Sequence, residues 1–305
     1  MTQFNMNRIP GILNVFERFR MPPTPIDQYG SVGRFALIDK LTPMVHVNQP
    51  LQFVMLGFPF KSTNDRDKVI GKLPDLAEQA TLDNFSMFDT QIKKEHCKGV
   101  EVSMVSDGFV FNDILGVSDK IVMDYKETSM DMGKNSPVKW FDLNDFYAGN
   151  DLNAKREKLI QQFGISPEKL QQDILMNPDV NFLYRGMIHF MEEELAIRNF
   201  PSRNQLQKEA KKIARAMMFR NEAYSNLVRQ EFKSHVRLSM HPSINNGAKY
   251  SFQLIPSPKA KHSAWHSALL IRKTGERETI HKKDAVAAGY ELVNQGGRPY
   301  YFAEA

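Results

Sequence analysis

The spacing of hydrophobic residues in the first third of the chain predicts a strand, a helix and a second strand. Leu51–Leu56 is a mostly apolar run that stops at the glycine and proline of Gly57-Phe-Pro-Phe-Lys61. Apolar residues then recur at helical spacing over 76–92, and Pro74 suits the first turn of that helix. Val100–Val105 is the second run. Because consecutive strands joined by a helix pair in parallel, this order predicts a parallel sheet with a right-handed crossover.

The middle of the chain reads as helical, and the last third returns to strands. Residues 1–25, which contain several prolines, are expected to wrap the surface. The helices are expected at 151–163, 167–175, 181–197 and from Ser202 onward, where Gln205 completes a capping-box pattern. The later strands are expected at 236–240, 250–255, 268–271 and 290–293.

These elements predict an α/β protein with a Rossmann-like parallel core sheet, a helical middle segment and additional C-terminal strands. We expect a single domain over residues 1–305. Within it, 1–29 is an N-terminal surface segment, 30–235 holds the α/β core and helices, and 236–305 supplies strands that complete the site.

The composition is that of a soluble globular protein, with 42% apolar and 25% charged residues. No run approaches the roughly 18 apolar residues that a membrane span needs, and the first residues lack the pattern of a secretory signal. The single cysteine, Cys97, excludes an internal disulfide and a cysteine-rich metal site. We therefore expect a cytoplasmic protein.

The net charge of +5 allows either an anionic small-molecule substrate or a nucleic acid. The densest basic run, Lys208 to Arg220, lies on a helical pattern whose apolar positions predict a buried stripe, which places most of the lysines on a solvated face. A basic nucleic-acid-binding protein stays open as an alternative of a different class, and it predicts steeply salt-dependent binding.

Reactive side chains stand where three of the expected strands end. Lys61 follows the first strand, Ser106 and Asp107 follow the second, and His241 follows the strand that carries Arg237. In open α/β sheets ligands bind outside the carboxyl ends of the strands. Each residue also has an ordinary interpretation as a turn residue, and Arg237 could be half exposed or could bind an anion.

Two other signals are weak. His262 and His266 have the spacing of metal ligands on a helix, but the prolines around 256–258 favour a loop and no third ligand is evident, so we expect no metal. Gly30 and Gly33 lack the third glycine and the preceding strand of a dinucleotide-binding motif. A dehydrogenase or methyltransferase therefore has little support.

Several segments together resemble the pyoverdine/dityrosine biosynthesis family, whose bacterial members are isonitrile synthases. They occur in family order from about residue 30 onward. The matching segments are Leu56-Gly-Phe-Pro-Phe-Lys61, Pro74-Asp-Leu-Ala-Glu78, Val105-Ser-Asp-Gly-Phe-Val-Phe-Asn-Asp113 with Asp119, Arg185-Gly-Met-Ile-His-Phe190, Val236-Arg-Leu-Ser-Met-His-Pro242 with Lys249, and Trp265-His266.

The resemblance implies a specific reaction. The amine of L-tryptophan or L-tyrosine condenses with the ketone of ribulose 5-phosphate, whose C2 becomes the isocyanide carbon while the rest of the sugar leaves by carbon–carbon cleavage. No cofactor is implied. An iron/2-oxoglutarate oxygenase is expected to act next on the product. Fungal relatives use tyrosine in a formyl-tyrosine pathway, so a family member that forms an N-formyl amino acid is the alternative within enzymes.

The resemblance also suggests roles for the polar residues. Arg237, Lys249 and Lys61 are candidates to bind the sugar phosphate, and Arg185 is a candidate for the phosphate or the substrate carboxylate. Asp107 and His241 are the expected acid and base, and His266 is a third possibility. Ser106 and His266 are also candidates to bind the substrate. Lys61 could instead form a Schiff base with the ketone. The roles of Asp113 and Asp119 stay open.

Overall fold

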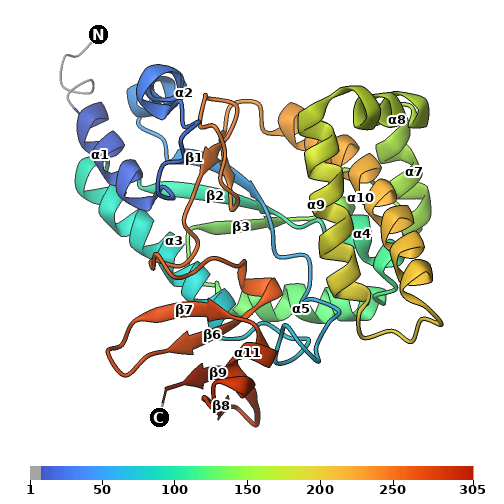
Figure 1. The fold of residues 1–305 in the computed structure, drawn as a ribbon. Coiled ribbons are helices and arrows are strands. Elements are labelled where there is room, and N and C mark those ends of the chain that lie inside the picture. Colours follow the sequence, from blue (N-terminus) through green and yellow to red (C-terminus); the bar gives the residue numbers. More distant parts are fainter. Residues whose placement is uncertain (1–7, 305) are drawn as a thin grey trace.

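The computed structural model describes residues 8–304, and its main sheet is entirely parallel (Figure 1). The strand order is β3-β2-β1-β4-β5, with every neighbouring pair parallel. The strands are β1 (Leu51–Leu56), β2 (Val100–Val105), β3 (Val138–Phe141), β4 (Val236–Ser239) and β5 (Tyr250–Ser251). The predicted parallel core is confirmed, and the bounds of β1 and β2 are those expected.

The crossover from β1 to β2 is helix α3 (Leu76–Glu95). Asp75 caps it, and Glu78 returns a bond to the Asp75 backbone, so the helix begins with a capping box. Pro74 therefore precedes the cap instead of lying in the first turn, because Asp75 supplies the acceptor that the first free N–H groups need. Phe85 and Phe88 are fully buried and anchor the helix in the core.

A helical lobe stands beyond the carboxyl ends of the strands (Figure 1). Its expected helices are confirmed, with small shifts at their ends, and α10 buries the predicted apolar stripe. The lobe comprises α7 (Leu152–Phe163), α8 (Pro167–Met176), α9 (Pro178–Leu195) and α10 (Arg203–Glu231), and α4 (Gly108–Leu115) connects β2 to it.

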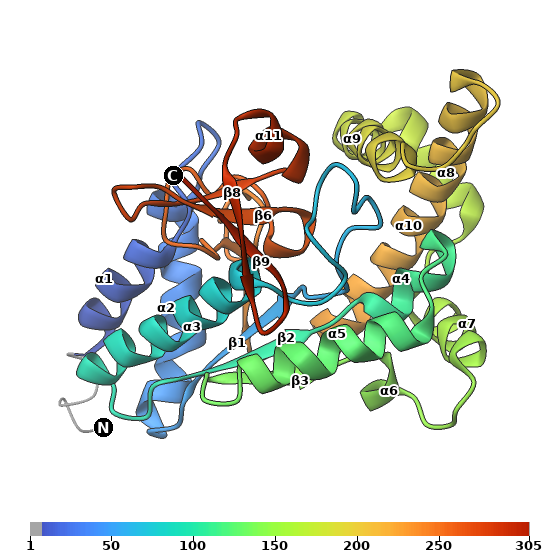
Figure 2. The same cartoon turned by 90° about the horizontal axis from the view of Figure 1, so that it is seen from below.

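The other helices flank the main sheet (Figure 2). They are α1 (Ile9–Phe19), η2 (Tyr29–Gly33), α2 (Arg34–His46), α5 (Asp119–Met132) and α6 (Leu143–Phe146). The expectation of a surface wrap at the N-terminus is wrong for α1, since Ile12 and Phe16 are fully buried and the helix packs on α3. Among the helices of residues 8–304, none has the length and apolar character needed to cross a membrane.

The C-terminal strands divide between two sheets. β4 and β5 complete the main sheet, whereas the remaining strands form a mixed sheet in the order β7-β6-β9-β8. These are β6 (Ala268–Ile271), β7 (Arg277–Ile280), β8 (Glu291–Gln295) and β9 (Arg298–Ala303), with η3 (Ala264–His266) before them and α11 (Lys282–Ala287) between β7 and β8. The second sheet packs against α3 and has its own small core around Leu270 and Phe302.

The strand expected over 250–255 is shorter than the pattern suggests. After Ser251 the chain leaves the edge of the sheet, and the Gln253 N–H donates to the carbonyl of Phe19 at the end of α1. Phe252 stacks on Phe85 in the core. The apolar run thus continues as packing residues without continuing the strand.

Candidate functional site

Asp107 and His241 stand at the same level of the main sheet. Met55 of β1 is in register with Met104 of β2 and with Leu238 of β4. Asp107 lies three residues beyond Met104, and His241 lies three residues beyond Leu238. Because β1 lies between them and strands are about 4.8 Å apart, the two strand ends are separated by about 10 Å. The expected convergence at one sheet edge is thus present.

Asp107 sits between the end of β2 and the first turn of α4. Its Oδ1 is buried without a hydrogen-bond partner among residues 8–304, and burial raises the pKa of the carboxyl group to about 6. Gly108 makes this position possible, since a Cβ there would lie 2.5 Å from the carbonyl oxygen of Pro59. The carboxyl group can therefore exchange a proton near neutral pH.

Ser106 belongs to the framework of this turn. Its Oγ donates to the carbonyl of Phe58 at 2.9 Å, and its own carbonyl accepts a hydrogen bond from the Tyr224 hydroxyl of α10 at 2.7 Å. Phe58 is fully buried in a left-handed conformation, with φ of 55°. These bonds fix the ends of β1 and β2 relative to α10.

The positive charges gather at β4 and β5. Arg237 is half-buried on β4, where it donates to Ser225 Oγ of α10 at 3.2 Å. Burial and the neighbouring charge of Arg237 lower the pKa of Lys249, and burial and Lys249 lower the pKa of His241. No carboxylate of residues 8–304 forms an ion pair with Arg237 or Lys249. This arrangement suits a doubly charged anion.

Lys61 is buried. Its ammonium group is 2.8 Å from Asp75 Oδ2 and 2.8 Å from Glu78 Oε2, and it donates to the Ala264 carbonyl at 2.9 Å. These contacts occupy all its protons. The carboxylates raise the pKa of Lys61 against the opposing effect of burial. The structure thus gives Lys61 contacts that join α3 to the turn before β6.

His266 is placed by that same turn. Ser62 N–H donates to the Trp265 carbonyl at 2.8 Å, and Ser263 Oγ lies 2.9 Å from His266 Nδ1. The ring meets Phe190 of α9 edge-on, with 4.9 Å between centroids. Burial lowers the pKa of His266 to about 3, so its imidazole is neutral at pH 7.

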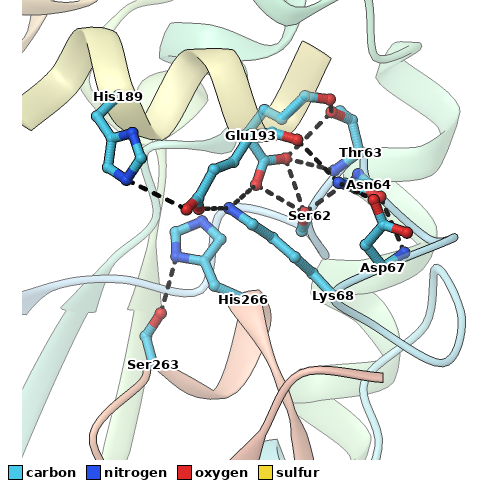
Figure 3. A network of polar contacts seen from close by, with 10 residues as sticks. Ser62, Thr63, Asn64, Asp67, Lys68, His189, Glu193, Ser263 and His266 are labelled. Atoms are coloured by element: carbon cyan, nitrogen blue, oxygen red, sulfur yellow. Dashed lines mark hydrogen bonds and ion pairs between the residues drawn. The ribbon is translucent and has the colours of Figure 1, made fainter. Parts of the chain in front are cut away.

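A polar network holds α9 onto the loop that follows β1 (Figure 3). Glu194 accepts hydrogen bonds from Ser62 Oγ at 2.7 Å and from the Thr63 N–H at 3.0 Å, and pairs with Lys68 at 3.0 Å. Lys68 also pairs with Glu193 at 2.8 Å. Sequence reasoning missed this network, although adjacent glutamates on a helix that meets a Ser-Thr-Asn loop were a possible signal.

Arg185 is not brought to this group of residues. It is exposed on α9, nine residues before Glu194, which at 3.6 residues per turn places it on the opposite side of the helix. Asp113 pairs with Arg220 at 2.8 Å, and Asp119 accepts from Asn112 at 2.7 Å. Both acids therefore form side-chain contacts that join α4 to a neighbouring helix.

No metal site is apparent in the described part of the chain. Within residues 8–304, no three His, Cys, Asp or Glu side chains are grouped as metal ligands. His262 and His266 do not share a helix face, since η3 covers only Ala264–His266, and His262 stacks on His281 instead. Gly30 and Gly33 lie in η2, where a Cβ on Gly33 would collide with the Asn245 carbonyl oxygen.

Several curated proteins of similar sequence are isocyanide or isonitrile synthases by name. Isocyanide synthase xanB of Aspergillus fumigatus is 29% identical over 89% of this chain, which spans 39% of that protein's length. L-tryptophan isonitrile synthase AmbI2 of Fischerella ambigua is 29% identical over 87% of the chain and 81% of its own length. An L-tyrosine isonitrile synthase of Xenorhabdus nematophila is 27% identical over 75% of the chain and 70% of its own length.

The fold has a close structural counterpart. The crystal structure of PvcA from Pseudomonas aeruginosa superposes with a TM-score of 0.89 at 22% identity, covering 98% of this chain and all of that one. At this identity the likeness concerns the fold. The sequence model of the family described as "Pyoverdine/dityrosine biosynthesis protein" matches residues 41–293, well over half of the 305 residues. The chain is therefore a member of the pyoverdine/dityrosine biosynthesis family.

Proposed function

We propose that this protein is an isonitrile synthase that converts the amino group of L-tryptophan or L-tyrosine into an isocyanide, with ribulose 5-phosphate as the carbon donor. The observation that carries the proposal is the placement of a protonatable carboxyl group at Asp107, whose Oδ1 has no hydrogen-bond partner within residues 8–304, at the same end of the sheet as the cations Arg237 and Lys249 and the imidazole of His241. Family membership supports the reaction class.

The cationic group suits the sugar phosphate. A phosphate ester carries nearly two negative charges at pH 7, and Arg237 offers a planar set of donors that lacks a carboxylate partner within residues 8–304. Burial and the charge of Arg237 lower the pKa of Lys249, and a bound dianion would offset this repulsion. Arg237 and Lys249 are therefore the proposed phosphate ligands.

The acid–base steps fall to Asp107 and His241. The substrate amine must lose a proton, attack C2 of the ketose and expel water to give an imine. A carboxylate at Asp107 can take the proton, and its conjugate acid can return it to the departing hydroxyl group. His241, neutral because its pKa is lowered, can act as the second base during the cleavages that remove the other sugar carbons.

Lys61 and His266 are given supporting roles. Since Asp75, Glu78 and two carbonyl groups of the turn that carries His266 surround the Lys61 ammonium, a role in positioning that turn fits Lys61 better than a Schiff base with the ketone. Neutral His266 can hydrogen-bond the substrate through Nε2. The proposed reaction requires no metal or redox cofactor. The proposal also includes a downstream iron/2-oxoglutarate oxygenase that acts on the product, and action in the cytoplasm.

Mass spectrometry of the purified protein with carbon-13-labelled sugar tests the proposal. The protein is incubated with [2-13C]ribulose 5-phosphate and either tryptophan or tyrosine. Label in the isonitrile of one amino acid establishes the reaction and the substrate. Folded protein that yields no labelled product with either amino acid refutes the proposed reaction.

An N-formyl product, which the resemblance to fungal members of the family implies, is the second candidate; Spore wall maturation protein DIT1 of Saccharomyces cerevisiae is 28% identical over 75% of the chain and 49% of its own length. A labelled formamide supports this candidate only when it forms faster than the isonitrile hydrolyses. Incubation in 18O-water gives the comparison, since hydrolysis of an isonitrile introduces the formyl oxygen from water.

A further inference from the structure

The helical lobe contains a hollow of about 450 Å³ that the proposed reaction does not use. Its lining residues belong to α8, α9 and α10. Arg215, on its rim, and Tyr224, which contacts Ser106, are nine residues apart on α10. At 3.6 residues per turn they lie on opposite sides of the helix. The hollow is thus separated from the carboxyl ends of the strands by the body of α10.

The rim of the hollow is cationic. Lys208, Lys211, Lys212 and Arg215 line it, and no acidic side chain does. Lys212 has a distant exposed partner in Glu209 at 3.5 Å. Within residues 8–304, no carboxylate forms an ion pair with the other three. Neighbouring cations that lack counter-ions favour a multiply charged anion.

The floor of the hollow is apolar and aromatic. Leu170 of α8 and Phe219 of α10 line it together with Tyr184 of α9. The Arg215 guanidinium lies 5.9 Å from the centre of the Tyr184 ring, and the Tyr184 hydroxyl reaches the Lys211 carbonyl at 3.4 Å. The Tyr184 ring therefore lies beside the cations. The volume of the hollow is within the range of small-molecule sites.

We propose that this hollow binds a phosphorylated small molecule with an aromatic body, the chemical class of nucleotides. The ring system packs against Tyr184 and Phe219, and the phosphates are held by Lys208, Lys211 and Arg215. A hollow with a cationic rim and an apolar floor fits a single ligand better than a nucleic-acid strand, which follows an extended groove with several stacking aromatics.

Isothermal titration calorimetry of the full chain, with ATP as the probe, tests this site. We expect one ATP per chain, with adenosine and inorganic phosphate each binding at least about tenfold more weakly, because each makes only part of the contacts. K211Q/R215Q should weaken ATP binding by about tenfold or more. Both side chains are exposed, so the substitutions leave the core unchanged.

Two controls separate this site from general charge effects and from the proposed active site. K94Q/K98Q removes the same charge from exposed positions in the last turn of α3 and just beyond it, and it should bind ATP like the original protein. R237Q should also leave ATP binding unchanged. ATP binding that R237Q abolishes, that K211Q/R215Q leaves intact, or that inorganic phosphate matches would refute the site.

A nucleic-acid surface is the remaining outcome to distinguish. A mixed-sequence oligonucleotide that binds more tightly than ATP, displaces it, and weakens steeply with salt would show a strand-binding face and overturn the proposal. Absence of saturable ATP binding would overturn it equally. Neither result bears on isonitrile formation, which is measured separately.

Discussion

The Lys61 ammonium lies 2.8 Å from Glu78 Oε2, and both side chains are buried in the interior. Asp75 is the second acid at the same distance. Burial raises the pKa of Glu78 to about 8, so a neutral Glu78 beside the Lys61–Asp75 pair leaves this cluster without net charge at pH 7. The Tyr125 hydroxyl, 3.0 Å from Glu78 Oε1, completes the set of partners.

Lys61→Met is therefore expected to destabilise the fold. Removal of one partner leaves buried Asp75 charged and unpaired, which costs about 3–5 kcal/mol in the free energy of unfolding. Denaturant titration measures this loss, and E78Q, which keeps the cluster neutral, is the matched control with a loss below about 1 kcal/mol. A K61M protein of undiminished stability that makes no product would instead favour the Schiff base.

The same cluster predicts a dependence of stability on pH. The pKa of Glu78 is raised from 4.5 to about 8, so the protonated group stabilises the folded state at low pH. This contribution is complete below about pH 4.5 and decreases as the pH rises toward 8. Between pH 5 and 8 the free energy of unfolding should therefore depend less on pH in E78Q than in the original protein. An identical pH dependence in both proteins would contradict the assignment.

Asp107→Asn should abolish turnover while the fold remains. The carboxyl group is the proposed base, and its pKa of about 6 implies that activity falls as the pH drops below that value. Because the charged form is disfavoured by burial, D107N should also raise the free energy of unfolding at pH 8, by about 1–3 kcal/mol. Near-normal activity of D107N would show that another group moves the proton.

Arg237→Gln should affect the sugar phosphate selectively. The loss of a charge-assisted contact should raise KM for ribulose 5-phosphate by about tenfold or more, with little change in KM for the amino acid. K98Q, at an exposed lysine distant in sequence, serves as the charge control. Equal increases in both KM values would indicate a general distortion of the β4 end.

Glu194→Gln should loosen the contact between α9 and the loop after β1. The carboxylate accepts from Ser62 and Thr63 and pairs with Lys68. Burial would raise the pKa of Glu194, but the contacts with Lys68 and Ser62 lower it. We expect a loss of about 2–4 kcal/mol and faster amide hydrogen exchange in residues 57–75. H189Q, at an exposed partner of Glu193, should leave that exchange unchanged.

Local patterns were sufficient for most of the framework. Six-residue runs gave β1 and β2 their bounds, and the apolar stripe of α10 identified its buried face. Short elements were missed, such as β3, in which three residues are half-buried and one is exposed. An edge strand of this length carries too little apolar pattern to be distinguished from a loop.

The sequence by itself determined the family, the parallel core and the polar residues at the strand ends, because these depend on local periodicity and on motif order. Only the tertiary structure decided which of those residues share a site. The register through Met55 brings Asp107 and His241 to one level of the main sheet. The helical period places Arg185 on the side of α9 opposite Glu194. The packing of the start of α3 against the loop after β1 gives Lys61 two acidic partners. Such outcomes depend on contacts between segments far apart in the chain, which local sequence does not encode.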